Sequence, residues 1–470
     1  MDIKRFVRNS GLALAALAAT AANAAERDTL TVFDAARFYD GYLVTNLPDD
    51  PTLEGILRHT TSNYAVKLTD EQLDQIGDSL QMHVWVQACC DNYDRIGNVN
   101  LAFVPKGRES YKVDYDNPDE GVERIEIGRF ITPFMNKNKK PDTVPYSYEV
   151  PYLSYIFRDA ALRAKYDIWV EFELFGVPYA ANTQISGCAD RSDVFLGTLK
   201  FSSLQENRGV QADKDVLVPI VIKKPEYLGH NFNNYSERGT DEIGKAIKTY
   251  EFEVPKDVKD GMVVLVTSNH GADSGGEEYN RRWHYVYYDG GEEPVLTYKP
   301  GRTSCEPFRK YNTQVNGIYT LFKRSDAGWQ EFSNWCPGDV IDNRIVALGS
   351  VKAGKHKITL SVPDAVFKDG KGDFPVSMFF QGLTDGEFDS IEGIEADKAQ
   401  SFVGFTVADG VLTAQSSEGV VEIEVRDLQG KLVRRNECQK SVSVADVRPG
   451  VYIVSAELTN GIIETHKVKL

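Results

Sequence analysis

The chain has 470 residues, of which 42% are hydrophobic and 26% are charged, and its formal net charge is −16. That length exceeds what one hydrophobic core usually organises, so we expect two or three domains. The acidic balance, with no basic stripe along the chain, argues against nucleic acid and anionic membrane surfaces as partners.

The first 25 residues have the features of a secretory signal peptide. Lys4, Arg5 and Arg8 precede the apolar run GLALAALAAT, and Ala22-Asn23-Ala24 places small residues at the cleavage positions. No other segment reaches the apolar length that a membrane span requires. We therefore predict an exported protein, in the periplasm, at the cell surface or outside the cell, with no membrane insertion.

Beyond this leader, alternating hydrophobicity dominates the chain. It predicts β-strands at 82–89, 124–131, 166–175, 215–222, 262–268, 284–289, 356–362 and 376–382. One helix is predicted at 69–80, with Thr69 as N-cap and Gln72 three residues later. Many strands with little helix predict an all-β protein built from antiparallel sandwiches or jelly rolls.

Two polar stretches divide the chain into blocks. The stretch 202–215 follows a strand-like segment, and the acidic run DGEFDSIEGIEAD occupies 385–397. We predict a signal peptide at 1–25, a first β domain at 26–201, a second at 210–385 and a small C-terminal β domain at 395–470.

The cysteines and histidines do not suggest a metal site. The six cysteines include no CxxC pair, and the seven histidines include no HxH pair. A copper monooxygenase, which would need clustered histidine ligands, is therefore disfavoured. In an exported protein the cysteines can form disulfides instead, and we predict neither a metal nor another cofactor.

Four short stretches carry the chemistry. They are CDNYDRIGNV (90–99), EIGRFITPF (126–134), GGEEYNRRWH (275–284) and SNWCPG (333–338). In this order they resemble the peptide-N-glycosidase F family. The resemblance implies two adjacent eight-stranded antiparallel jelly rolls, with the active site in the cleft between them.

The resemblance also implies an activity, hydrolysis of the amide that joins asparagine to the first N-acetylglucosamine of N-linked glycopeptides and glycoproteins. The products are aspartate and a released glycan. The matching catalytic acids are Asp94, Glu278 and Glu171. A match shifted by one residue would place Glu277 in the role given to Glu278. Glu171 and Glu173 share one face of their strand, which could equally face solvent.

Further positions match substrate-binding residues of the family. They are Tyr93, Arg95, His270, Tyr279, Arg282 and Trp335. The alternative for Arg95 is a salt bridge to Asp91. Two family tryptophans are replaced by Tyr93 and Tyr279, so glycan preference is left open. A glycan-binding protein without catalysis, on the same paired jelly rolls, is the alternative function.

The resemblance implies a disulfide between Cys305 and Cys336. Near the first motif, Cys89 and Cys90 either pair with each other or one of them pairs with Cys188. We favour a bridge to Cys188, because adjacent cysteines cannot reach ordinary disulfide geometry without distorting the peptide between them. Cys438 is then unpaired.

The C-terminal segment resembles a type IX secretion sorting domain. The resemblance lies in VRDLQGKLVRR (425–435), SVADVRPGVYIVSAEL (443–458) and THKVKL (465–470). It implies an interaction with that secretion machinery. The alternative is an accessory β-sandwich.

Overall fold

The computed structural model describes residues 27–43, 45–115, 117–211, 215–224, 244, 246–271, 277–302, 304–314, 334–366, 373–388, 403–408, 410–416, 420–427, 431–437, 440–458 and 463–470. The predicted signal peptide and Cys438 lie outside these ranges. Within them, no helix has the length and apolar character needed to cross a membrane.

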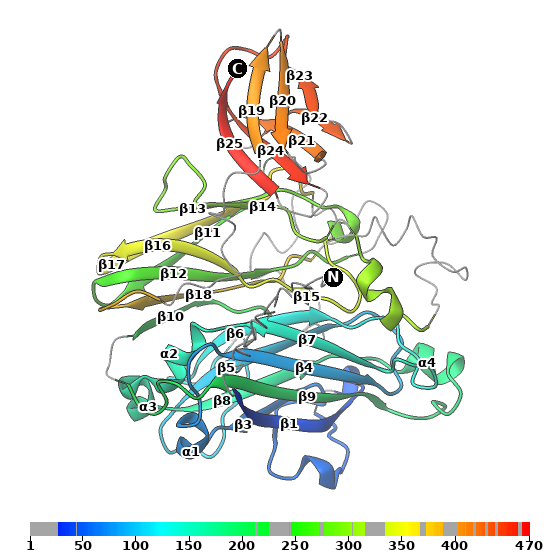
Figure 1. Ribbon diagram of the computed structural model, residues 1–470. Helices are drawn as coiled ribbons and strands as arrows, with labels where there is room; N and C mark the ends of the chain where they lie inside the picture. Colours follow the sequence, from blue (N-terminus) through cyan, green and yellow to red (C-terminus); the bar gives the residue numbers. More distant parts are fainter. Residues whose placement is uncertain are drawn as a thin grey trace, which may run out of the picture.

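Two antiparallel sheets pack face to face to form the first sandwich (Figure 1). The β4 sheet has the order β1 (Arg27–Tyr39), β9 (Asp193–Leu204), β4 (Gln81–Ala88), β7 (Thr143–Glu149). The β5 sheet has the order β15 (Val340–Ile341), β6 (Glu123–Ile131), β5 (Ile96–Pro105), β8 (Tyr166–Leu174), β3 (Asn63–Lys67), β2 (Leu57–Arg58).

Side-chain alternation explains the core of this sandwich. In β4, Met82, Val84 and Val86 are fully buried, whereas the side chains between them are partly exposed. Successive residues of a strand point to opposite faces, so one face of the β4 sheet meets Val99 and Leu101 of the β5 sheet. Each such buried side chain stabilises the fold by about 1.5–3 kcal/mol relative to exposure.

The second sandwich has two sheets of four strands among the described residues. The β12 sheet has the order β10 (Asp215–Val221), β18 (Val376–Leu383), β12 (Val258–Thr267), β16 (Arg344–Val351). The β17 sheet has the order β11 (Ile247–Val254), β17 (Gly354–Ser361), β13 (His284–Tyr288), β14 (Leu296–Tyr298). Their apolar faces enclose a separate core.

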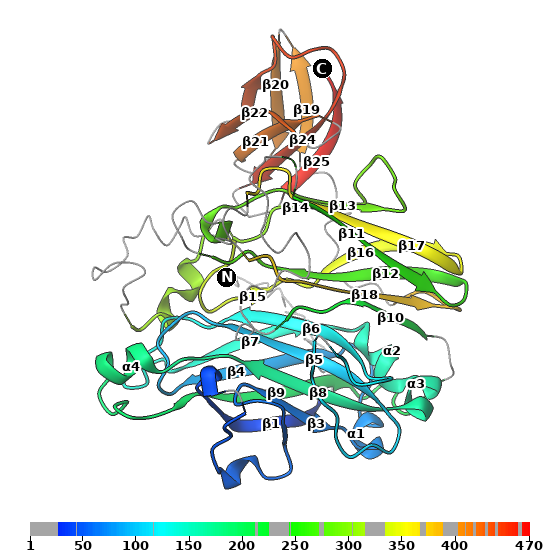
Figure 2. The ribbon, with the colours of Figure 1, turned by 180° about the vertical axis from the view of Figure 1, so that it is seen from behind.

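A third, smaller pair of sheets lies at the far end of the second sandwich (Figures 1 and 2). One contains β19 (Val403–Ala408), β20 (Val411–Ser416), β23 (Ser441–Ser443), and the other β22 (Leu432–Glu437), β21 (Val420–Arg426), β24 (Val451–Leu458), β25 (Ile463–Lys469). Ion pairs join it to the second sandwich, with Lys299 Nζ 2.5 Å from Glu422 and Arg426 2.5 Å from Asp364.

The first and second sandwiches share both a strand pairing and buried polar contacts. Strand β15 comes from the chain segment between the second-sandwich strands β14 and β16, yet it pairs with Arg129 and Phe130 of β6. Arg129 is fully buried and forms a 2.7 Å ion pair with Glu126. Its other nitrogen donates to Ser268 Oγ at 2.9 Å and to the carbonyl of Pro375 at 2.8 Å. Because these groups would be costly to leave unpaired, they fix how the two sandwiches meet.

The strands predicted from alternation are confirmed as β4, β6, β8, β10, β12, β13, β17 and β18. The all-β, multi-sandwich fold class is confirmed as well. The first sandwich differs from the expected eight strands, because the short strands β2 and β15 extend the β5 sheet to six.

The helix predicted at 69–80 is shorter than expected. Thr69 and Gln72 form the predicted capping box, but α1 (Asp70–Leu73) ends after four residues. Gly77 N donates to Ser203 Oγ at 2.9 Å and Asp78 N donates to the carbonyl of Glu206 at 3.2 Å. These two backbone N–H groups therefore bond to the end of β9 and the residues after it, and are not available to extend the helix. The structure also contains the short helices α2 (Leu153–Arg158), α3 (Ala160–Lys165) and α4 (Tyr179–Gln184).

Candidate active site

The loop that carries Asp94 joins β4 to β5 and is held from within by Asp91. The fully buried carboxylate of Asp91 accepts hydrogen bonds from Tyr93 N at 2.8 Å and Val177 N at 2.6 Å. It also forms a 2.8 Å ion pair with Arg95 Nε. This salt bridge is the alternative to substrate binding that was considered for Arg95 in the sequence analysis. Three donors on one carboxylate make this loop a rigid element.

Thr132, just after β6, holds the backbone on both sides of Asp94. Its hydroxyl accepts from Arg95 N at 2.7 Å and donates to the carbonyl of Tyr93 at 3.0 Å, and its own N–H donates to the carbonyl of Arg95 at 2.8 Å. Asp94 therefore has a fixed backbone, and its side chain is partly exposed.

The segment 334–341 connects this loop to the acidic turn of the second sandwich. At one end, Gly338 N donates to the carbonyl of Ile131 at 2.9 Å, and Ile131 N donates to the carbonyl of Asp339 at 3.0 Å. At the other end, Asn334 Nδ2 donates to the carbonyls of Glu277 and Glu278 at 2.8 and 2.7 Å. One short segment thus links the surroundings of Asp94 and Glu278.

The turn itself distinguishes the two adjacent glutamates. It is a 3₁₀ helix (Glu277–Tyr279) in which Glu277 is 1% exposed. Glu277 accepts from Arg282 at 2.8 and 3.1 Å and from Val366 N at 2.9 Å. Arg282, predicted to bind substrate, is therefore engaged in holding Glu277. The carboxylate of Glu277 serves the fold, which favours the register that selects Glu278. The side chain of Tyr279 lies outside the description.

His270 and Trp335 form a stacked pair beside this turn. Their ring centroids are 5.9 Å apart with planes at 25°, and Trp335 Nε1 donates to the carbonyl of Asn269 at 3.0 Å. His270 Nε2 lies 2.8 Å from Ser268 Oγ. Burial, and then the charges of Arg129 and Lys223, lower the pKa of His270 well below its usual value. The imidazole is therefore neutral at pH 7.

Glu171 is not placed at this site. It is fully buried, and every contact described for its carboxylate comes from the first sandwich. Arg124 donates to it at 2.8 Å through Nε, with Nη2 2.5 Å away, while Tyr111 OH and Asn100 Nδ2 donate at 2.8 and 2.9 Å. Burial alone would raise its pKa, but the charge and hydrogen bonds of Arg124 outweigh burial and lower the pKa to about 2.

The neighbouring Glu173 is the member of this strand face that meets the second sandwich. It pairs across the sheet with Asn63 and Asn98, and its carboxylate lies 3.5 Å from Nζ of Lys223, just after β10. Two residues on one face thus have different surroundings, because different parts of the chain cover them.

A cavity of about 330 Å³ opens next to Trp335. Asn334, Asp339, Arg302 and Arg344 contribute polar lining. The same Asn334 and Asp339 take part in the link between the two acidic loops. The cavity therefore adjoins the candidate site on its second-sandwich side. Within the described ranges, no group of three His, Cys, Asp or Glu residues is arranged to hold a metal ion.

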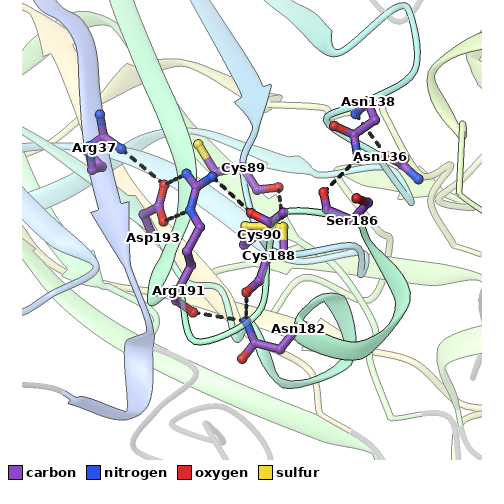
Figure 3. The surroundings of a disulfide bond; sticks show 11 residues. Arg37, Cys89, Cys90, Asn136, Asn138, Asn182, Ser186, Cys188, Arg191 and Asp193 are labelled. Carbon is purple, nitrogen blue, oxygen red and sulfur yellow. Dashed lines mark hydrogen bonds and ion pairs between the residues drawn. A yellow bond between two sulfur atoms is a disulfide. The ribbon is translucent and has the colours of Figure 1, made fainter.

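Both predicted disulfides are present. Cys305 and Cys336 are joined, which anchors the segment that carries Trp335. Cys90 is the partner of Cys188, and Cys89 is a buried free thiol (Figure 3). Burial, and then the charge of Asp193, raise the pKa of Cys89 to about 12, so the thiol is unreactive at neutral pH.

Comparison with known proteins defines the family. A model described as peptide-N-glycosidase F, N terminal, matches residues 29–188, and one described as peptide-N-glycosidase F, C terminal, matches 234–381. Together they match more than half of the chain. The chain belongs to the peptide-N-glycosidase F family.

Two solved structures of a distant protein share this architecture. The chain is similar to PNGF-II in two crystal forms, with 19% and 18% identity and a TM-score of 0.53 in each case. The alignments cover 77% of this chain and 66% and 65% of PNGF-II. A crystal structure of peptide-N(4)-(N-acetyl-β-D-glucosaminyl) asparagine amidase is 14% identical, with a TM-score of 0.49, covering 77% of this chain and 98% of the other. No curated protein matched the sequence.

Proposed function

We propose that the protein is an exported peptide-N-glycosidase that hydrolyses the amide between asparagine and N-acetylglucosamine in N-linked glycopeptides and glycoproteins. The observation that carries this proposal is the link between the two acidic loops. Thr132 fixes the loop of Asp94 and directly follows Ile131. The segment 334–341 is bonded to Ile131, pairs with β6, and holds the turn of Glu278 through Asn334.

In this mechanism, water attacks the amide carbon of the asparagine side chain. Asp94 takes a proton from the water, because its partly exposed side chain stands on a rigid loop and can be approached by solvent. Glu278 binds the first sugar and the water near the scissile bond. As the carbon–nitrogen bond breaks, the proton taken by Asp94 passes to the leaving nitrogen. Aspartate remains in the peptide, and the glycosylamine that is released then hydrolyses to glycan and ammonia.

Other residues position these groups. Arg95 and Arg282 hold Asp91 and Glu277, so their charges keep the acidic loops in place. Neutral His270 supports the ring of Trp335 rather than acting as a general acid. Tyr93, whose ring lies 5.1 Å from the Arg95 guanidinium, provides an aromatic face next to Asp94.

Export is supported by the leader-like N-terminus and by two disulfides, which persist in oxidising compartments. We propose in addition that the C-terminal β domain is read by a type IX secretion machinery. This second proposal rests on sequence resemblance alone.

The test of catalysis is a mass measurement on a defined N-glycopeptide. The mature protein should release the glycan and convert asparagine to aspartate, with incorporation of isotopically labelled oxygen from water. Asp94→Asn should lower kcat by at least about a hundredfold, since general-base catalysis contributes about 10²–10⁴. Asp49→Asn, at an exposed aspartate elsewhere, is the matched control. Binding of the glycopeptide without any cleavage by the wild-type protein would instead support the glycan-binding alternative.

A further inference from the structure

Two tyrosines stand out on the surface near the candidate site. Tyr42 is 67% exposed and Tyr179 is 61% exposed. All other exposed large hydrophobic side chains in the described residues are valines or an isoleucine. An exposed aromatic side chain that packs into no core is a candidate for ligand binding.

Both tyrosines are attached to the segment 175–179 that follows β8. The ring of Tyr42 meets the ring of Phe175 edge-on, with centroids 5.4 Å apart at 81°. Gly41 N donates to the carbonyl of Gly176 at 2.8 Å, which fixes the turn that presents Tyr42. Tyr179 begins α4 at the other end of the segment.

The same surface continues to the proposed catalytic loop. The ring of Tyr93 lies 6.4 Å from that of Tyr179, tilted by 37°, and Tyr93 directly precedes Asp94. Burial, and then the neighbouring Tyr179, raise the pKa of Tyr93 above its usual value, so its hydroxyl stays protonated. The aromatic faces therefore lead from the solvent to the loop of Asp94.

This surface is rigid before any ligand binds. The Cys90–Cys188 disulfide anchors the end of the α4 loop next to the loop of Asp94. Asn92 Nδ2 donates to Gln184 Oε1 at 2.8 Å, and Asn182 Nδ2 donates to the carbonyl of Arg191 at 3.1 Å (Figure 3 shows Asn182). Preorganised side chains lose little conformational entropy on binding.

We propose that Tyr42, Tyr93 and Tyr179 form an extended subsite for the oligosaccharide of the substrate, beyond the sugar joined to asparagine. The subsite deepens the function proposed above and rests on it. Tyrosine faces fit the CH faces of pyranose rings, and the hydroxyls suit sugar hydroxyls. The guanidinium of Arg95 lies near the rings of Tyr93 and Phe175 and is already paired with Asp91. A neutral glycan therefore fits this surface better than a charged peptide.

The first experiment measures binding of free neutral oligosaccharides to the mature protein by calorimetry. It uses a series from the two-sugar core to a full oligomannose glycan, none of which contains a scissile amide. Tyr179→Ala should weaken binding of the long oligosaccharides by about three- to tenfold, the range expected for one aromatic contact. Tyr179→Phe should retain most of the affinity, and binding of the two-sugar core should be unchanged. Val295→Ala, at an exposed apolar side chain in the second sandwich, is the matched control.

A second experiment separates glycan from peptide. With glycopeptides of fixed peptide and increasing glycan, Tyr42→Ala and Tyr179→Ala should raise KM increasingly while kcat is kept. An effect that grows with peptide length at fixed glycan would identify a peptide surface and overturn the proposal. Unchanged oligosaccharide affinity in both alanine variants would also overturn it. The calorimetric result does not depend on turnover, so it stands apart from a failure of the proposed hydrolysis.

Discussion

Replacement of Glu171 by glutamine distinguishes a structural carboxylate from a catalytic one. Glu171→Gln keeps the size of the side chain but removes the charge that balances Arg124 in a fully buried site. The guanidinium is then left without its counter-charge. Because Tyr111 and Asn100 donate to different oxygens of the carboxylate, only one of them keeps an oxygen acceptor in the amide. We expect a protein that is less stable but still cleaves glycopeptides when folded.

Two estimates of the loss agree. Breaking a buried ion pair by removing one partner typically costs about 3–5 kcal/mol. The pKa of Glu171 falls from the usual 4.5 to about 2 in the folded protein, and at about 1.4 kcal/mol per unit this corresponds to about 3 kcal/mol. Because the folded pKa is depressed, this stabilisation is complete above about pH 5 and is lost as the pH falls from 4.5 towards 2.

Urea unfolding at pH 7 and pH 3 measures the effect. The midpoint of Glu171→Gln should fall at pH 7 and approach that of the wild type at pH 3. Glu251→Gln, at an exposed position of β11, is the control. The paired change Arg124→Met with Glu171→Met should recover much of the stability, because it removes both charges. A Glu171→Gln protein of unchanged stability that has lost hydrolysis would refute this reasoning and return Glu171 to the catalytic set.

Three further outcomes are expected. Burial, and then the charge of Asp159, raise the pKa of Asp215 to about 8. The free energy of unfolding should therefore decrease as the pH rises from about 4 to 8, by up to about 1.4 kcal/mol per pH unit. Denaturant titrations at several pH values should show a flatter pH dependence for Asp215→Asn. Removal of the Cys90–Cys188 disulfide, whose cysteines are 98 residues apart, should lower the free energy of unfolding by up to about 4–5 kcal/mol and allow proteolysis within 177–192. Cys89→Ala, which leaves the disulfide intact, should cause neither effect. Hydrolysis should survive EDTA, and activity lost on chelation and restored by one metal would contradict the carboxylate mechanism.

The strands could be predicted from the sequence because burial on one face leaves a period-two pattern. β4 alternates between buried and partly exposed residues along its whole length. The capping box at Thr69 was also visible, since it is a local contact. The length of α1 was not, because its end depends on hydrogen bonds to β9, more than a hundred residues away.

The surroundings of the acidic residues could be predicted only where they depend on nearby residues in the sequence. Glu171 and Glu173 are equivalent by alternation, and what separates them is whether Arg124 or Lys223 lies above. Similarly, no spacing rule indicates that Arg282 binds the glutamate one residue before Glu278. Tyr42 and Tyr179, far apart in sequence, carry no motif at all. They are brought to one surface by ring contacts in the folded protein, Tyr42 with Phe175 and Tyr179 with Tyr93.

Strand β15 has a consequence for how such proteins can be divided or can evolve. It covers part of an edge, at β6, whose N–H and C=O groups would otherwise be open to pairing with another molecule. A first sandwich produced alone would expose that part of β6, and Arg129 would lose its hydrogen bonds to Ser268 and Pro375. Self-association is the expected fate of such a fragment. The first sandwich therefore depends on the second for an edge strand, and a foreign domain put in place of the second sandwich would have to supply a strand that pairs with β6.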